Sequence, residues 1–210
     1  MDDHECLLPL RGDAWDEEEA KRILKHAQAR REQIFTGAYI VTNNGSTRPK
    51  IDIVCEAITS AREMASGLVK MIRADRTLEN ATAVIAKYVP MCAPFTAYEI
   101  VCDRHWTPLL SRAPDILTWA NPGPGATRGL NRIHGRPVKQ KTARQLLLGE
   151  MRELLKESQQ PGRLGKHMQS LEMRDVERSL CKLDKYLRAK NGEGRPRSRY
   201  HPPARAIKAA

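Results

Sequence analysis

The sequence predicts an all-α protein with a single helical domain, and three observations support this. Apolar residues recur at helical spacings of three, four and seven over most of the chain. The one strand-like apolar run, Ala38 to Val41, is short and is closed by Asn44-Gly45 and Pro49. Hydrophobic residues make up 40% of the 210 residues, which is enough to build a core.

The start and stop signals of the helices follow one another along the chain. Asp16 and Thr77 are capping residues, Pro94 suits a first helical turn, and Pro90 and Thr107-Pro108 end helices. The apolar set from Ile51 to Ile72 keeps its spacing for about six turns, which predicts one long helix. The segment 121–126 is expected to be a rigid loop. The expected helices span residues 17–36, 51–72, 78–89, 94–106, 139–158 and about 168–190, and residues 127–137 are expected to form a short helix or a turn.

Charge divides the chain into three parts. Residues 1–20 hold eight acids against Arg11, whereas residues 128–152 and 188–210 each hold seven Lys or Arg against one Glu. We therefore expect a flexible acidic arm at 1–14, a helical domain at 15–190 and a flexible basic tail at 191–210. The net charge of +11 favours a polyanionic partner such as nucleic acid. The alternative is a solvated face followed by a soluble tail.

Several classes of protein are disfavoured by the sequence. No apolar stretch is long enough to span a membrane, and the acidic start does not resemble a signal peptide, so we expect a cytoplasmic protein. Five scattered cysteines predict reduced thiols, and six isolated histidines give no metal motif. No GxxxxGK[ST] phosphate loop is present. We expect neither a metal nor a cofactor.

The segment from Tyr88 to Ala97 has the outline of a helix-hairpin-helix motif. In that motif two glycines present backbone N–H groups to a DNA phosphate. Here Met91 and Cys92-Ala93 stand where the glycines are expected. A proline-broken helix pair without DNA contacts is the alternative interpretation.

Longer stretches carry a family resemblance. They are FTGAYIVTN (35–43), PFTAYEIVCDRHWTPLL (94–110), DILTWANPGPGATRGLNRIHGR (115–136) and LEMRDVERSLCKLDKYLRAKNGEGRPRSRY (171–200). The chain resembles the alpha-glutamyl/putrescinyl thymine pyrophosphorylase family, the amino acid:DNA transferases of phage thymine hypermodification. That family is related to the helical domain of hydroxymethyluracil DNA kinases and to helix-hairpin-helix DNA glycosylases, which implies a fold of the glycosylase type.

The resemblance also implies a reaction. An amino acid or amine would displace pyrophosphate from a pyrophosphorylated 5-hydroxymethyluracil base and leave a hypermodified thymine. The implied partners are double-stranded DNA containing modified thymine, an amino acid or polyamine co-substrate, and a companion DNA kinase, with no membrane. For a phage-encoded protein the compartment would be the host cell cytoplasm.

Such a displacement needs cations for the leaving pyrophosphate and an acid that handles the amine proton. Arg128 and Arg132 lie four residues apart after the Pro-Gly loop and are our candidates for pyrophosphate binding. Asp103 is the candidate base, with Glu99 one turn earlier. Alternatively, Asp103 pairs with Arg104 or Arg128.

The remaining candidates serve substrate and DNA. Asn121, also placed among the catalytic candidates, and Asn131 would contact base edges or a substrate carboxylate, or else cap turns. Trp119 would stack on a base, or else lie in the core. The expected substrate-binding residues are Tyr98, Trp119, Asn131, Gly123 and Gly125. The expected DNA-binding residues are Arg136, Lys139, Lys185, Arg195, Arg197 and Arg199.

Three other functions stay open from the sequence. The chain could be a non-catalytic DNA-binding module that partners a hydroxymethyluracil DNA kinase, because related helical domains occur fused to such kinases. It could be a glycosylase-like enzyme, which predicts abasic sites. The third alternative is a basic structural protein, whose DNA binding would not depend on which base the DNA contains.

Overall fold

A computed structural model describes residues 14–35, 46–165 and 170–193, and all regular secondary structure in these ranges is α-helical. The all-α prediction is thus confirmed for the described residues, none of whose helices is long and apolar enough to cross a membrane. The segment Ala38 to Val41 and most of the acidic arm and basic tail lie outside these ranges, and the domain boundaries stay predictions. The helices are α1 (Glu17–Ala29), α2 (Lys50–Glu63), α3 (Ala65–Ala74), α4 (Leu78–Tyr88), α5 (Pro94–Arg104), α6 (Pro124–Ile133), α7 (Arg144–Ser158) and α8 (Met173–Lys190).

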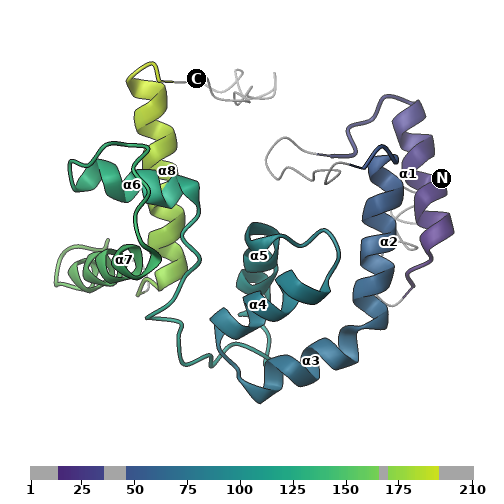
Figure 1. Cartoon of the computed structure of the whole chain (residues 1–210), viewed down its shortest axis with the longest axis horizontal. Coiled ribbons are helices and arrows are strands. Elements are labelled where there is room, and N and C mark those ends of the chain that lie inside the picture. The colour runs from purple at the N-terminus through teal and green to yellow at the C-terminus, as the bar shows by residue number, and fades with distance from the viewer. Residues whose placement is uncertain (1–13, 36–45, 166–169, 194–210) are drawn as a thin grey trace, which may run out of the picture.

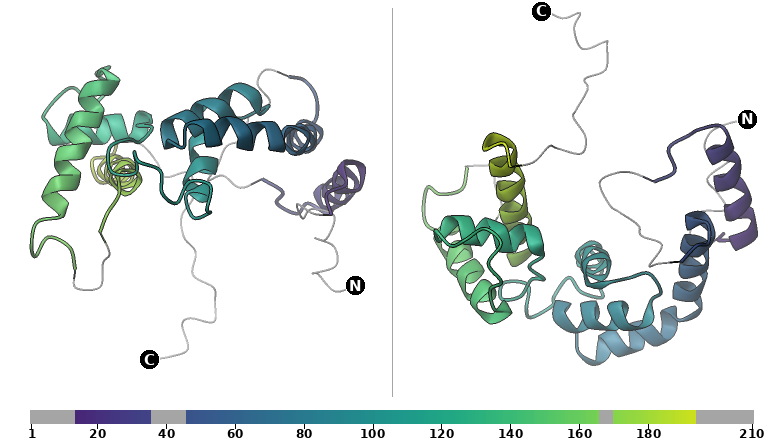
Figure 2. Two further views of the ribbon diagram at one scale, coloured as in Figure 1. Left: turned by 90° about the horizontal axis from the view of Figure 1, so that it is seen from below. Right: turned by 45° about the horizontal axis from the view of Figure 1, so that its top comes forward.

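The helices follow an arc (Figures 1 and 2). α1 and α2 form one end, α3 and α4 the middle, and α6, α7 and α8 the other end, with α5 packed against α4 inside the arc. A central hydrophobic core joins α3 through α8, and a smaller cluster of Ala20, Ile51 and Cys55 holds α1 against α2. The central core therefore positions α5, α6 and α8 relative to one another.

Side-chain caps start the helices where the sequence indicates. The Asp16 carboxylate accepts a hydrogen bond from the Glu19 N–H at 2.8 Å, and the Thr77 hydroxyl accepts one from the Asn80 N–H at 3.1 Å. Asp115 adds a long-range cap, because its carboxylate accepts from the Leu78 and Glu79 N–H groups. This contact fastens the turn after α5 to the start of α4.

Several expected helix boundaries are wrong, including the starts of α7 and α8, which begin at Arg144 and Met173 and not near 139 and 168. The long helix at 51–72 is two helices that meet at Met64, beside Ser66-Gly67, a pair that favours kinks. α1 ends at Ala29 and not at 36, because Arg31 adopts a left-handed conformation (φ +62°) that terminates the helix. α6 begins at Pro124, so half of the expected 121–126 loop is its first turn.

α4 and α5 form a helical hairpin at the segment that resembles the helix-hairpin-helix motif. Met91 in its turn has a left-handed backbone (φ +63°), although that conformation favours glycine. The position expected to hold a motif glycine therefore keeps the backbone shape of a glycine. The likeness to helix-hairpin-helix glycosylases stays a prediction.

Two glycines of α6 allow it to contact α8 directly. A Cβ at Gly129 would lie 2.5 Å from the Leu180 carbonyl oxygen, and one at Gly125 would lie 2.6 Å from Cys181 Sγ. No larger residue fits at position 129 unless the two backbones separate. This close approach sets the distance between the side chains that α6 and α8 present to each other.

We predict that Gly129→Ala lowers the free energy of unfolding by about 2–3 kcal/mol, because the new methyl group collides with backbone and not with a mobile side chain. Gly149→Ala in α7 is the matched control, since a Cβ there meets nothing within 4 Å. It should stabilise the protein by up to about 1 kcal/mol through helix propensity. Urea denaturation followed by circular dichroism measures both, and equal effects would contradict the close packing.

Candidate active site

α8 directs two buried carboxylates toward α6. Glu177 and Asp184 are seven residues apart and so lie on the same side of the helix, and their exposed fractions are 8% and 1%. Sequence reasoning gave neither residue a role. The available signal was that both acids lie beside the apolar seam of α8, which includes Val176 and Leu180.

Asp184 holds the two arginines that were expected to bind pyrophosphate. Its two oxygens accept hydrogen bonds from Arg128 Nε at 2.8 Å and Arg132 Nε at 3.1 Å. The terminal nitrogens of Arg132 donate to Glu193, and this bond lowers the pKa of Glu193 to about 2. The two guanidinium groups do share one face of α6, but acids of the chain itself occupy it.

Glu177 has no such cationic partner on α6. Its Oε1 accepts a weak hydrogen bond, 3.4 Å long, from the Gly123 N–H at the start of α6. Burial raises the pKa of Glu177 to about 7; the Gly123 N–H opposes this rise and the Glu99 carboxylate adds to it. A carboxyl that titrates near neutral pH is suited to general acid–base chemistry.

Residues of α5 and of the following loop surround Glu177. The Tyr98 ring packs edge-on against Trp119 at 5.6 Å between centroids. Its hydroxyl is buried and makes no hydrogen bond of good geometry within the described part of the chain. Burial raises the pKa of Tyr98 and, to about 11, that of the Cys102 thiol. Both groups are therefore neutral near pH 7.

Glu99 and Asn121, which were also predicted from the sequence, lie near Tyr98. Glu99 pairs with Arg178 at 3.1 Å, and Asn121 Nδ2 donates to the Pro94 carbonyl at 3.1 Å. We call Tyr98, Glu99, Asn121, Gly123 and Glu177 the Glu177 cluster. Four of the five were singled out from the sequence: Gly123 contacts Glu177, Tyr98 and Glu99 lie close enough to interact with it electrostatically, and Asn121 fastens the loop before Gly123 to the start of α5.

The other candidates lie elsewhere. Asp103 is exposed on α5 and forms no ion pair with any described residue, including Arg104 and Arg128. Trp119 is 5% exposed and belongs to the central core, where Arg144 covers its ring. Gly125 faces Cys181 of α8. Among these residues, only Asp103 has a side chain open to solvent.

The Asn131 side chain holds a turn. Its Nδ2 donates to the carbonyl groups of Val138 and Gln140, and its Oδ1 accepts from Arg136 Nε at 3.0 Å and from the Thr142 hydroxyl. Every hydrogen-bonding position of the buried amide is therefore used within the protein. This is the turn-stabilising alternative stated for Asn131, and it closes the connection between α6 and α7.

The expected DNA-binding residues differ in their surroundings. Arg136 forms an ion pair with Glu150, whereas Lys139 and Lys185 are exposed. Arg195, Arg197 and Arg199 lie outside the described residues. No three His, Cys, Asp or Glu side chains converge on a possible metal position within the described ranges.

Comparison with known proteins places the chain in a family. A family model described as the helical domain of 5-hmdU DNA kinase matches residues 5–195. The chain belongs to this family. The expected relationship to the helical domain of hydroxymethyluracil DNA kinases is thus confirmed, and membership in the pyrophosphorylase family stays a prediction. Neither a curated protein nor a solved structure matches the chain.

We predict that Glu177 makes the stability of this helical domain depend on pH. Because its folded pKa (about 7) lies above the ordinary value of 4.5, the folded state binds its proton more tightly, and the free energy of unfolding falls between about pH 4.5 and 7. The loss is on the order of 2–3 kcal/mol. Urea denaturation at pH 5 and 8 should show a smaller loss for Glu177→Gln than for wild type. The control Glu63→Gln, at an exposed site, should lose as much unfolding free energy between pH 5 and pH 8 as wild type does. If Glu177→Gln also loses as much, Glu177 is not the group that titrates.

A second prediction concerns Asp184. Asp184→Asn leaves Arg128 and Arg132 without their shared counter-charge, so the free energy of unfolding should fall by about 3 kcal/mol. Asp103→Asn, an exposed acid that forms no ion pair among the described residues, should change it by less than about 0.5 kcal/mol. Thermal and urea denaturation measure both variants. If Asp184→Asn left the free energy of unfolding unchanged, the ion pairs of Asp184 would contribute nothing to stability.

Proposed function

We propose that the chain is an amino acid (or amine):DNA transferase of thymine hypermodification. It would replace the pyrophosphate of a pyrophosphorylated 5-hydroxymethyluracil base in DNA with an amino acid or a polyamine. Membership in the 5-hmdU DNA kinase helical domain family supports the pathway, because that family's name refers to the same modified base. The observation that carries the reaction type is the buried Glu177 carboxyl, whose pKa is about 7.

An amine must lose a proton before or while it attacks. At neutral pH a substantial fraction of Glu177 is ionised and can accept that proton, whereas an ordinary carboxylate with a pKa near 4.5 is a much weaker base. The amine nitrogen forms a bond to the exocyclic C5 methylene carbon, and the carbon–oxygen bond to pyrophosphate breaks. The bonding pair leaves with pyrophosphate, and the amine proton goes to Glu177 Oε.

The leaving anion needs positive charge close to Glu177. The N-terminus of α6 supplies it, because the first-turn N–H groups after Gly123 are at the positive end of the helix dipole. Arg128 lies one turn further along α6 and is 30% exposed on its side chain while its Nε binds Asp184. In this proposal the Arg128 guanidinium stabilises the leaving pyrophosphate. Arg132 mainly holds the Asp184 and Glu193 side chains in position through its hydrogen bonds.

A second function has its own supporting observation. Arg132 is fully engaged by acids of the chain, and Arg128 is partly engaged, which is the arrangement expected of a structural arginine pair. A non-catalytic DNA-binding module that partners a hydroxymethyluracil DNA kinase needs no free arginine at this place. In that case the exposed Lys139 and Lys185 would contribute to DNA binding without any chemical step.

The deciding experiment is mass spectrometry of nucleosides from DNA whose 5-hydroxymethyluracil a companion kinase has first converted to the pyrophosphorylated base. After incubation with the protein and a pool of amino acids and polyamines, we expect a new nucleoside that carries one amine. Glu177→Gln should reduce its formation by about 100-fold or more, the usual contribution of a general base. The rate should rise with pH until Glu177 is ionised and level off above about pH 7.

Two controls make the outcome decisive. Glu63→Gln removes an exposed acid on α2 and should retain wild-type activity, while Arg128→Ala should lower it. The pyrophosphorylated base must be demonstrated in the starting DNA. If that base persists unchanged and the protein still binds DNA in a salt-dependent manner, the binding-module function holds and the transferase does not.

A further inference from the structure

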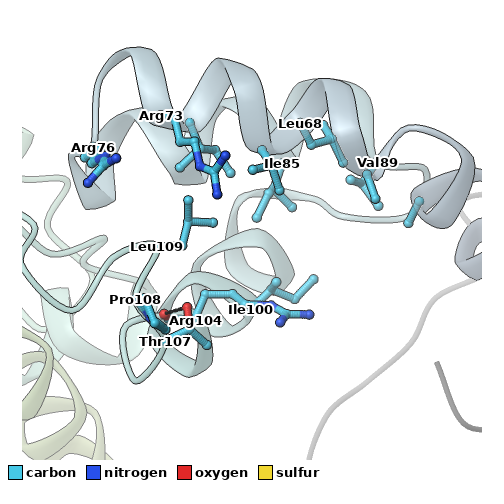
Figure 3. Close-up of a pocket in the computed structure, with 14 residues that line it drawn as sticks. Leu68, Arg73, Arg76, Ile85, Val89, Ile100, Arg104, Thr107, Pro108 and Leu109 are labelled. Carbon is cyan, nitrogen blue, oxygen red and sulfur yellow. Dashed lines mark hydrogen bonds between the residues drawn. The ribbon is translucent and has the colours of Figure 1, made fainter. Parts of the chain in front are cut away.

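A pocket in the middle of the arc has no part in the chemistry proposed above. It lies between α3, α4, α5 and the turn at 107–109, with a volume of about 990 Å³. Its wall is aliphatic and includes Leu68, Ile72, Ile85 and Ile100. Figure 3 shows Arg73 of α3, Arg76 of the turn between α3 and α4, and Arg104 of α5 at the pocket. The pocket thus combines an apolar wall with a cationic rim.

The pocket is separate from the Glu177 cluster. Ile100 and Arg104 of α5 line the pocket, whereas Tyr98 and Glu99 of the same helix belong to the cluster. Ile100 is two residues beyond Tyr98 and therefore faces the opposite side of the helix. The two sites share α5 as a common wall, and the chemistry proposed for Glu177 makes no use of the pocket.

The rim arginines differ from those between α6 and α8. Arg73, Arg76 and Arg104 are exposed, and none forms an ion pair with any residue in the described ranges. Asp75 and Asp115, which lie nearby in the chain, accept hydrogen bonds from backbone N–H groups at the start of α4. Three positive charges are therefore left at the mouth of an apolar cavity, which favours an anion with an apolar body.

We infer that this pocket binds an unpaired segment of DNA, with bases against the aliphatic wall and phosphates on the three arginines. The inference rests on the proposed function only in taking DNA as the ligand. A duplex would present phosphates but no free base face to the apolar wall, whereas an unpaired strand presents both. Arginine guanidinium planes also stack on bases. Two exposed aromatic residues, Tyr88 and Trp106, directly precede the lining residues Val89 and Thr107.

The test is fluorescence anisotropy with a labelled, unmodified 12-nucleotide single strand and its duplex. Replacing all three rim arginines by Gln should weaken single-strand binding at least tenfold. It should also reduce the slope of log affinity against log salt by about 2, as expected for three lost phosphate contacts. The control Arg62→Gln/Arg112→Gln/Lys182→Gln removes the same charge from exposed sites outside the pocket. It should weaken binding by less than threefold.

Equal losses in the two triple variants, or equal wild-type affinity for the strand and the duplex, would overturn the inference. A second measurement does not depend on any variant. Ultraviolet crosslinking of an oligothymidine to the wild-type chain, followed by peptide mapping, should label residues 61–76, 85–89 or 100–109, and crosslinks confined to other peptides would refute the pocket. These experiments use unmodified DNA and no amine. The pocket can therefore fail its test while the transferase assay succeeds, and the transferase assay can fail while the pocket passes its test.

Discussion

The contact between α6 and α8 is the constraint on which the candidate site depends. Gly125 and Gly129 leave no side chain between the helices, so the backbone of α6 lies against Leu180 and Cys181. This proximity buries Glu177 and Asp184 and brings them within reach of Gly123, Arg128 and Arg132. A wider spacing would admit water between the helices, lower the pKa of Glu177 and lengthen the bonds of Asp184.

The two acids show how partners decide the role of a buried carboxylate. Asp184 is neutralised by two guanidinium groups and stabilises the helix pair. Glu177 is almost as buried but has only one long backbone hydrogen bond, so burial raises its pKa toward neutrality. The paired acid and the acid to which we propose a chemical role thus lie on one face of one helix, two turns apart.

α5 divides the middle of the molecule in a similar way. One side carries Tyr98 and Glu99 toward the Glu177 cluster, and the other carries Ile100 and Arg104 into the pocket. Because both sites share this rigid helix, a strand held in the pocket would be fixed relative to a base presented to Glu177. The structure thereby offers a physical link between the two proposals.

The sequence by itself determined the helical class and the starts of α1, α2, α4 and α5, because periodicity, caps and prolines act locally. It also named Tyr98, Glu99, Asn121 and Gly123. Only the tertiary structure decided that these four belong to one cluster with Glu177, that Arg128 and Arg132 are paired with Asp184, and that Asn131 holds a turn. Each of these outcomes depends on residues far apart in the chain, such as position 123 against 177, and on burial. Long-range proximity leaves no local pattern in the sequence, and the place of Glu177 and Asp184 beside the apolar seam of α8 does not by itself show which partners each acid meets.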